Sequence, residues 1–295
     1  MQNVVPVQLR QVRDFGQIIT DTFQFLKQNR GPLFRAIAVI CLPIGLIAGF
    51  LMGKTVGDIQ SLAFGMGAGD PDTMLRGLIT NFIPMIIGYL LVIVAYVLLI
   101  SVVHEYIRAY SLGEHHMITT KDLWDRARGQ AGTYFGTGFL SGLLIMVGFI
   151  LCILPGFYPL TVLSLVFICH AIERTGATGS MARSNNLVKD RFWETLGLIL
   201  IIGLINMVIS YVIMLPFTIV GFVVGFNNVL GAVDGSGGGV TWLGTFTAIQ
   251  MAVQMAVGML IHPISSVAMG LKYFTLVEEK EGAGLRQKLE GFEQA

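Results

Sequence analysis

The chain has 295 residues, of which 54% are hydrophobic and 13% are charged, and its formal net charge is +1. So apolar a composition would leave a soluble domain with too little polar surface, and the nearly neutral charge argues against a nucleic-acid binder. The mean hydropathy of +0.72 predicts a membrane protein instead.

The first predicted element is an amphipathic helix that precedes the first apolar run. Phe15, Ile18, Ile19, Phe23 and Leu26 recur with helical spacing, and polar residues occupy the other faces. Such a helix is expected to lie in the membrane interface or to pack under a helix bundle. The start of the chain lacks the charged region, apolar run and cleavage site of a signal peptide, so none is expected.

Six apolar runs are each long enough for a membrane-spanning helix, which needs about 20 residues. Leu154-Pro155-Gly156-Phe157-Tyr158-Pro159 separates the third run from the fourth and predicts a tight hairpin. Pro216 in the fifth run and His262-Pro263 in the sixth predict kinks. The runs cover residues 33–53, 79–104, 136–154, 157–173, 195–225 and 246–275.

Two further amphipathic stretches precede the third and fifth runs. Thr119-Thr120-Lys121-Asp122 predicts a capped helix start, followed by Leu123 and Trp124. Residues 180–189 lead into Phe192 and Trp193, which are aromatic residues suited to the membrane interface. The sequence therefore predicts three interfacial helices, each ahead of an odd-numbered span.

The basic residues are sorted between the polar gaps. All nineteen Lys and Arg residues except Lys54 and Arg76 lie in alternate gaps. Because basic residues in short loops are retained on the cytoplasmic side, we expect a bacterial inner-membrane protein with both termini in the cytoplasm. Anionic membrane lipids or a membrane-protein partner are expected to dock on this face. The candidate docking residues are Trp124, Arg126, Arg128, Arg183, Lys189, Arg191 and Trp193.

The cytoplasmic gaps also resemble one another. Phe25-Leu26-Lys27-Gln28-Asn29-Arg30 is similar to Leu187-Val188-Lys189-Asp190-Arg191-Phe192. One interpretation is a threefold repeat of an interfacial helix plus a hairpin within a single all-α membrane domain. The alternative is that any six-span protein with cytoplasmic ends contains three hairpins. The repeat units would cover residues 10–110, 115–175 and 176–277, followed by a tail over 278–295.

Several motifs carry a family resemblance. Leu154-Pro155-Gly156-Phe157-Tyr158, Glu173-Arg174-Thr175-Gly176, the run from Ala182 to Trp193 and the ending from Tyr273 to Gly282 are the segments concerned. Together they resemble the membrane domain of the bacterial glycerophosphoryl diester phosphodiesterase family and its relatives of unknown function. The resemblance implies an integral membrane architecture. It implies no enzyme activity, because in that family the phosphodiesterase chemistry belongs to a separate soluble barrel domain.

The richest cluster of ionisable residues is His104-Glu105, followed by Glu114-His115-His116, at the predicted cytoplasmic end of the second span. Imidazole and carboxylate groups hold divalent metals, but the His-Glu-x-x-His spacing that places two ligands on one helical face is missing. A polar helix end and a solvated turn account for the cluster equally well. We therefore expect no catalytic residue, metal or cofactor. A lipid enzyme would require these side chains to converge on one pocket.

Polar residues inside the apolar runs are few and are functional candidates, because they are costly to bury in lipid. No mid-membrane carboxylate is found among them, so an ion-coupled site lacks its usual ligand. Hydrogen bonding between helices and a transport pathway are both open interpretations. The candidates are His170, Asn206, Gln250, Gln254 and His262.

Glycines also suggest two roles. The segment Gly138-Phe139-Leu140-Ser141-Gly142 permits close helix approach, whereas residues 65–69 and 235–239 predict outer loops. On the sequence alone we favour a non-enzymatic structural or accessory membrane protein that organises a membrane assembly or the local lipid. A transporter or channel for a small or lipid-like solute is the alternative, and a polar cavity reaching Asn206, Gln250 or His262 would support it.

Overall fold

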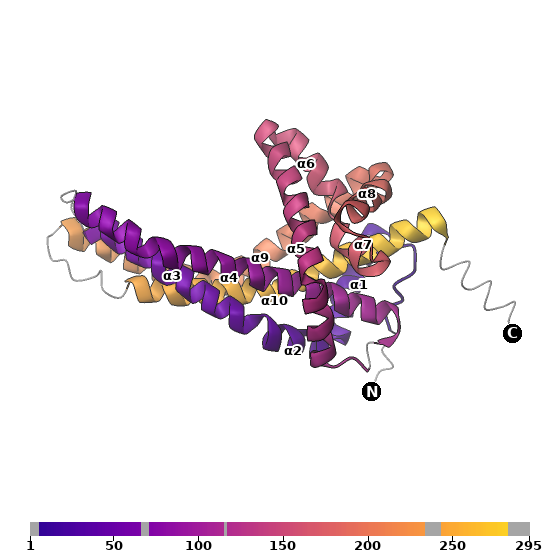
Figure 1. Cartoon of the computed structure of the whole chain (residues 1–295), viewed down its shortest axis with the longest axis horizontal. Coiled ribbons are helices and arrows are strands. Elements are labelled where there is room, and N and C mark those ends of the chain that lie inside the picture. The colour runs from indigo at the N-terminus through magenta and orange to yellow at the C-terminus, as the bar shows by residue number, and fades with distance from the viewer. Residues whose placement is uncertain (1–5, 66–70, 115–116, 234–242, 283–295) are drawn as a thin grey trace, which may run out of the picture. The chain divides into compact units, whose positions relative to one another are not determined.

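The computed structural model describes residues 6–65, 71–114, 117–233 and 243–282. Within these ranges the chain is helical and contains no strand (Figure 1). The helices are α1 (Phe15–Gln28), α2 (Arg30–Ile40), α3 (Leu42–Gly65), α4 (Pro71–Ser111), α5 (Thr120–Leu151), α6 (Ile153–Val162), α7 (Val166–Glu173), α8 (Ala177–Val188), the 3-10 helix η2 (Lys189–Arg191), α9 (Phe192–Val233) and α10 (Leu243–Glu281).

Six stretches of the described residues are long and apolar enough to cross a membrane, which confirms the predicted number of spans. The chain is therefore an all-α polytopic membrane protein. The spans are Leu42–Gln60, Leu75–Ser111, Thr120–Leu151, Ile153–Glu173, Ala177–Phe226 and Gly244–Glu281.

Two local predictions need correction. The chain reverses between the third and fourth spans as predicted, but the turn lies at Cys152, whose backbone is extended (φ −171°, ψ 151°), and residues 154–159 lie inside α6. The second predicted interfacial helix is the first part of α5 and not a separate element. Helices α9 and α10 continue through Pro216 and Pro263, so neither proline breaks its helix, and the kinks stay predictions.

Capping boxes begin both α1 and α5, and the one at Thr119 confirms the predicted start of α5. Asp14 accepts a hydrogen bond from the backbone N–H of Gln17, and the Gln17 side chain accepts one from the backbone N–H of Asp14. Thr119 and Asp122 make the same reciprocal pair at the start of α5. Each box satisfies donors that a helix start leaves without an intrahelical partner.

The described residues form two compact units, each assembled from separated segments. Unit 1 comprises Met1–Ile37, Val97–Asn206 and His262–Ala295, and unit 2 comprises Ala38–Tyr96 and Met207–Ile261. Because neither unit is a continuous segment, they do not coincide with the three predicted repeat units. The threefold repeat stays a prediction.

In unit 1, aromatic residues anchor the N-terminal segment. Tyr106 in α4 donates a hydrogen bond to Asn29 Oδ1 (2.8 Å), and Tyr110 donates one to the carbonyl oxygen of Val7 (3.1 Å). The fully buried ring of Phe25 packs edge-on against both tyrosines. These contacts hold α1, the first predicted interfacial helix, against α4, although Phe23 on its predicted apolar side is 41% exposed.

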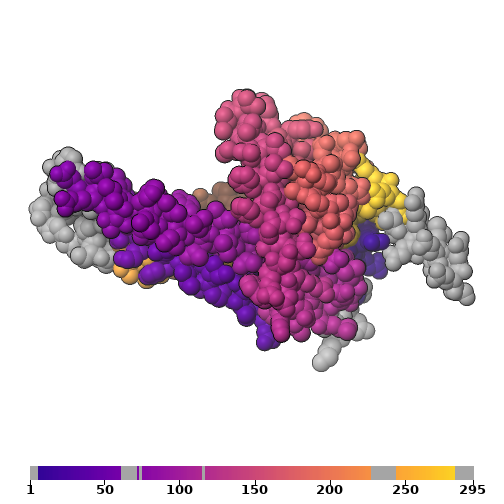
Figure 2. All heavy atoms as spheres, in the orientation of Figure 1, coloured from indigo at the N-terminus to yellow at the C-terminus, as the bar shows by residue number. Residues whose placement is uncertain are grey.

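Helix α5 leaves one side uncovered within unit 1. It runs along the face turned to the viewer in Figure 2. Large apolar side chains are exposed along it, as expected for a helix whose surroundings are hydrocarbon. They include Phe135, Phe139, Leu143, Leu144, Val147 and Ile150.

Unit 2 combines α3 with the first part of α4, the last part of α9 and the first part of α10. Helix α3 approaches α10 along a stripe of four glycines, Gly45, Gly49, Gly53 and Gly57, which we call the glycine stripe. A Cβ atom added at Gly53 would lie 2.5 Å from the Cα atom of Ala248 in α10. Because no side chain separates the two backbones, they pack in direct contact.

Candidate functional site

A buried ion pair joins α4 to the end of α7 in unit 1. Glu105 is fully buried, and both of its carboxylate oxygens accept hydrogen bonds from the Arg174 guanidinium, at 2.8 and 2.6 Å. Tyr134 in α5 donates a third hydrogen bond to Glu105 (3.3 Å). Two parallel N–H donors and one hydroxyl thus compensate the burial of this carboxylate.

The backbone of Arg174 is unusual. With φ 54°, it is the one non-glycine residue with a positive φ in the described part of the chain. A side chain in this left-handed region costs about 1–2 kcal/mol, so surrounding contacts must hold it there. The pair with Glu105 and the hydrogen bond from its own N–H to the carbonyl oxygen of His170 supply those contacts.

Aromatic and imidazole rings surround Tyr134. The ring of His170 meets it edge-on at 4.8 Å, and His104 lies at 6.1 Å. His170 Nδ1–H donates to the carbonyl oxygen of Thr175, while its buried Nε2 atom has no partner among the described residues. His104 Nδ1–H donates to the carbonyl oxygen of Ile100, one turn earlier in α4. Both rings therefore hydrogen-bond locally to backbone carbonyl oxygens.

Two more ion-pair groups tie α7, α8 and α9 to α10. Arg183 bridges Glu173 (2.7 Å) and Glu281 (2.6 Å), and Tyr273 also donates to Glu173. The side chain of Lys272, only 1% exposed, reaches Glu194 at 2.6 Å. These groups lie in helices that the sequence separates widely, so unit 1 is held together by charge as well as by apolar packing.

Most of the predicted basic docking residues are paired inside the protein. Arg126 pairs with Glu114, Arg128 with Asp125, and Arg191 with Glu194 and Glu279. Lys189 is exposed, Trp193 is 80% exposed and Trp124 is at the margin of exposure. Exposed aromatic rings at the ends of α5 and α9 suit a membrane interface.

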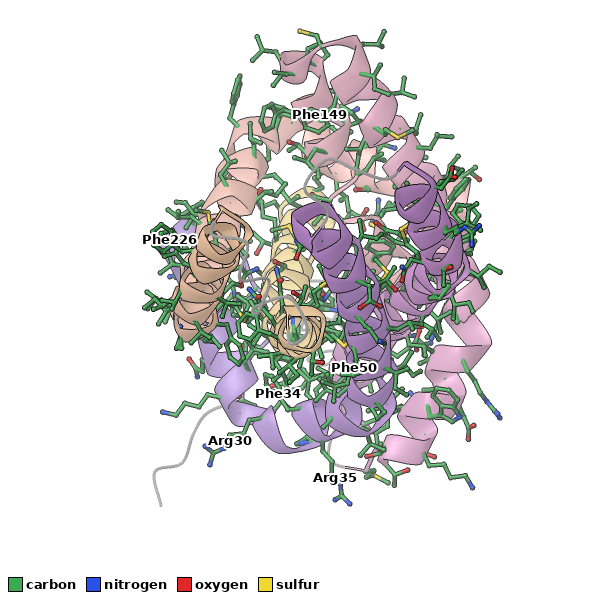
Figure 3. The ribbon with its side chains drawn as sticks, turned by 90° about the vertical axis from the view of Figure 1, so that its left-hand side faces the viewer. Arg30, Phe34, Arg35, Phe50, Phe149 and Phe226 are labelled. Atoms are coloured by element: carbon green, nitrogen blue, oxygen red, sulfur yellow. The ribbon has the colours of Figure 1, made fainter. Side chains whose placement is uncertain are left out.

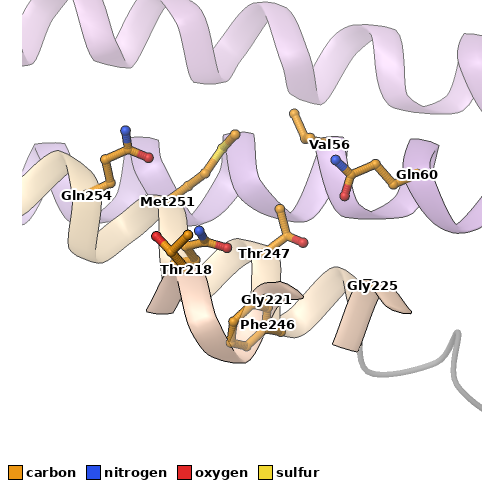
Figure 4. A pocket seen from close by; sticks show the side chains of 10 residues that line it. Val56, Gln60, Thr218, Gly221, Gly225, Phe246, Thr247, Met251 and Gln254 are labelled. Atoms are coloured by element: carbon orange, nitrogen blue, oxygen red, sulfur yellow. The ribbon is translucent and has the colours of Figure 1, made fainter. Parts of the chain in front are cut away.

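Unit 2 contains a polar groove, which we define by the residues that line it (Figure 4). Its volume is about 410 Å³, and it lies among α3, α9 and α10. Both predicted glutamines, Gln250 and Gln254, line it together with uncharged side chains and glycines. The lining residues are Val56, Gln60, Thr218, Gly221, Gly225, Phe246, Thr247, Gln250, Met251 and Gln254.

A second cavity adjoins this groove. It has a volume of about 300 Å³ and lies among α3, α4 and α10, where Tyr89 and Tyr96 contribute to its wall. Met251 and Gln254 line both spaces. These two side chains therefore form the partition between them.

The remaining predicted membrane residues make hydrogen bonds between or within helices of unit 1. Asn206 Nδ2 donates to Ser265 Oγ (2.7 Å), and the buried Asn206 Oδ1 has no partner among the described residues. His262 and Ser266 form a hydrogen bond at 3.2 Å. His170 lies in the aromatic cluster and lines none of the cavities described here.

The predicted ionisable cluster is only partly described. His104 and Glu105 face different partners, and His115 and His116 lie outside the described residues, as do the predicted loop segments 66–69 and 235–239 and residues 283–295 of the tail. Over the described ranges, no group of three or more His, Cys, Asp or Glu residues could hold a metal ion.

Sequence reasoning missed two features. The glycine stripe was visible as a four-residue repeat from Gly45 to Gly57, the spacing that puts small residues on one helix face. The pairing of Glu105 with Arg174 had no local signal, since 68 residues lie between them.

No family model, no curated protein and no solved structure matches the chain.

Proposed function

We propose that the protein moves a lipid or a lipid-like solute across the membrane along the polar groove of unit 2. The observation that carries this proposal is the set of uncharged polar side chains that line the groove on membrane-spanning helices. Thr247, Gln250 and Gln254 follow one another on a single face of α10, at spacings of three and four residues.

The exposure of these groups supports a membrane-facing path. Gln254, Gln60 and Thr218 are exposed on unit 2, and Gln250 is half-buried. A polar amide that faces hydrocarbon without a hydrogen-bond partner costs roughly 2–7 kcal/mol. A lipid headgroup in the groove would supply that partner, while the acyl chains remain in the surrounding hydrocarbon.

The lining favours a neutral contact over an ionic one. No Asp, Glu, Lys or Arg residue lines the groove or the adjoining cavity. The polar stripe from Thr247 to Gln254 covers about 10 Å along α10 at 1.5 Å per residue. It would therefore shorten the apolar barrier of about 30 Å by roughly a third.

A lipid-scrambling assay tests the proposal. Proteoliposomes that carry a fluorescent phospholipid are treated with dithionite, which bleaches only lipids in the outer leaflet. We expect the purified protein to expose inner-leaflet lipid faster than protein-free liposomes do. We expect the double variant Gln250→Leu/Gln254→Leu to be about thirtyfold slower, because each of the two lost hydrogen bonds to a headgroup raises the barrier by about 1 kcal/mol.

Thr245→Leu is the matched control, since Thr245 is exposed on the same helix but does not line the groove. This variant should scramble at the wild-type rate. A wild-type rate for the glutamine double variant, or a wild-type protein no faster than empty liposomes, would contradict the proposal.

A second candidate function is the structural or accessory role expected from the sequence, with the basic face directed to the cytoplasm. Its supporting observation is the pair Arg30 and Arg35 on α2, whose side chains project away from the ribbon in Figure 3. Neither residue has an ion-pair partner among the described residues. Unpaired arginines beside a membrane-spanning helix favour anionic lipid.

Lipid retention tests this second role. We expect Arg30→Gln/Arg35→Gln to bind phosphatidylglycerol about thirtyfold more weakly than the wild type and to lose it during purification, because each arginine contributes about 1 kcal/mol to anionic lipid binding. Native mass spectrometry counts the retained lipids. Arg128→Gln is the control, since Arg128 already pairs with Asp125. Equal retention in all three proteins would count against lipid docking at α2.

A further inference from the structure

A third cavity lies within unit 1, and we call it the serine cavity. Its volume is about 380 Å³, and residues of α5, α6, α7, α9 and α10 contribute to its wall. Most of that wall is apolar, and no charged residue lines it. The polar groups in the wall are the side chains of Ser141, Ser164 and Ser265.

A break in a membrane-spanning helix forms part of the wall. Helix α6 ends at Val162 and α7 begins at Val166, and Leu163 and Ser164 in the break line the cavity. Ser184 in α8 fixes the break, because its hydroxyl donates to the carbonyl oxygen of Val162 (2.6 Å) and accepts from the N–H of Leu165 (3.3 Å). Irregular backbone at membrane depth is tolerated where it is buried in protein or lines a cavity.

Two of the serine hydroxyls are buried without a partner. Ser141 is 5% exposed, and neither its Oγ atom nor that of Ser164 makes a hydrogen bond among the described residues. A hydroxyl in a helix usually donates to the carbonyl four residues earlier. Thr22, Thr161 and Thr275 all do so in this protein. Ser141 does not, and neither does Thr137 one turn earlier in α5, which lies outside the cavity wall.

The hydroxyl group of the third serine, Ser265, can also donate a hydrogen bond. Asn206 Nδ2 donates to Ser265 Oγ, which leaves the Ser265 hydroxyl hydrogen free for another acceptor. The cavity wall thus offers three hydroxyl donors on an apolar surface. An unsatisfied buried hydroxyl costs about as much as a lost hydrogen bond, so an acceptor inside the cavity would stabilise all three.

We infer that the serine cavity binds an uncharged, largely apolar lipid through its carbonyl oxygens, and the ester carbonyls of a diacylglycerol are the acceptors that fit this donor set. Gly142, which lines the cavity, is exposed, and a Cβ atom there would meet no atom within 4 Å. This residue marks an opening through which a lipid enters sideways. The inference concerns unit 1 only and does not depend on the polar groove of unit 2.

Photo-cross-linking tests the inference on the full chain in phosphatidylcholine nanodiscs. The probe is a diacylglycerol with a photoreactive group on one acyl chain, and the cross-linked peptides are identified by mass spectrometry. We expect saturable labelling of peptides that line the serine cavity. Excess unlabelled diacylglycerol should compete, whereas phosphatidylglycerol, which has the same esters and an anionic headgroup, should not. A quinone with an apolar tail is a further competitor, because its carbonyl groups are not esters. Its effect distinguishes ester carbonyls from other uncharged carbonyl groups as the acceptors in the cavity.

Two variants remove the site by different means. Ser141→Ala/Ser164→Ala removes two donors and should weaken binding of the probe about tenfold. Gly142→Leu fills the opening and should abolish labelling. Thr137→Val is the control for the first variant, because Thr137 has a buried, unpartnered hydroxyl on the same helix but does not line the cavity. Gly132→Leu is the control for the second, because Gly132 is exposed with open space around it.

The outcomes separate this inference from the proposed function. Three results would overturn the inference. They are labelling that does not saturate, labelling that the control variants reduce as much as the site variants do, and labelling that falls only on helices of unit 2. Scrambling lost in the groove variants with diacylglycerol binding retained would leave the serine cavity as an independent site. Competition by the quinone alone would overturn the assignment of ester carbonyls.

Discussion

Arg174→Ala is expected to destabilise the protein by about 3–5 kcal/mol, because it leaves the Glu105 carboxylate buried without its cation. Glu105 is fully buried, and Arg174 supplies two of its three hydrogen bonds. Thermal unfolding of detergent-purified protein, followed by tryptophan fluorescence, measures the change. Arg174→Gly should be less harmful than Arg174→Ala, because glycine adopts φ 54° without a steric penalty.

Two comparisons make this prediction specific. Arg128→Ala removes an exposed ion pair with Asp125 and should cost less than about 1 kcal/mol. Arg174→Met/Glu105→Met replaces both charges with apolar side chains and should recover most of the lost stability. If Arg174→Ala unfolded at the same temperature as Arg128→Ala, the buried pair would not contribute to the fold in the way its geometry implies.

Sequence patterns predicted the features that depend on local physics. The apolar runs gave the six spans because each run alone can cover the hydrocarbon core. The capping box at Thr119 marked a helix start because its donors and acceptors lie within three residues. The apolar side of α1 followed from helical spacing only in part. Ile18 and Leu26 are buried as that spacing requires, whereas Phe23 is 41% exposed and Phe25, which the spacing did not include, is fully buried.

The misplaced turn between α5 and α6 has a physical explanation. Pro155 and Gly156 suggested a turn, but Pro155 lies in the first turn of α6, where its missing N–H has no intrahelical partner to lose. The N–H of Gly156 bonds to the carbonyl oxygen of Cys152 and continues the helix. A proline in the first turn and a proline in a loop are alike in sequence, so the position of the reversal could not be read from composition.

The candidate site was predictable only in part. Gln250 and Gln254 were identified because polar residues in an apolar run are rare, but the partners that make them a groove come from α3 and α9. The ion pairs Glu105–Arg174 and Lys272–Glu194 join residues far apart in the chain. Such pairs depend on tertiary packing, for which a single sequence carries no period or spacing.

Gly53→Ala is expected to destabilise unit 2 by about 1–3 kcal/mol, although it adds a single methyl group. The new Cβ would lie 2.5 Å from both the Cα atom of Ala248 and the carbonyl oxygen of Thr247, and 2.9 Å from the Cβ atom of Met251. The first two atoms belong to the backbone of α10, which cannot rotate away as a side chain can. The two helices must therefore separate, and the midpoint of thermal unfolding should fall by several degrees.

Two other glycines of unit 2 serve as comparisons for this loss of stability. Gly225→Ala should leave the midpoint unchanged or raise it, because its Cβ meets no atom within 4 Å and alanine favours the helix. The unfolding midpoint of Gly45→Ala should lie between those of Gly53→Ala and Gly225→Ala, because the nearest neighbours of its new Cβ are the flexible Sδ and Cε atoms of Met259. Equal midpoints for Gly53→Ala and Gly225→Ala would mean that α3 and α10 do not pack in backbone contact. Because Thr247 and Met251 also line the polar groove, separation of these helices should slow lipid scrambling together with the loss of stability.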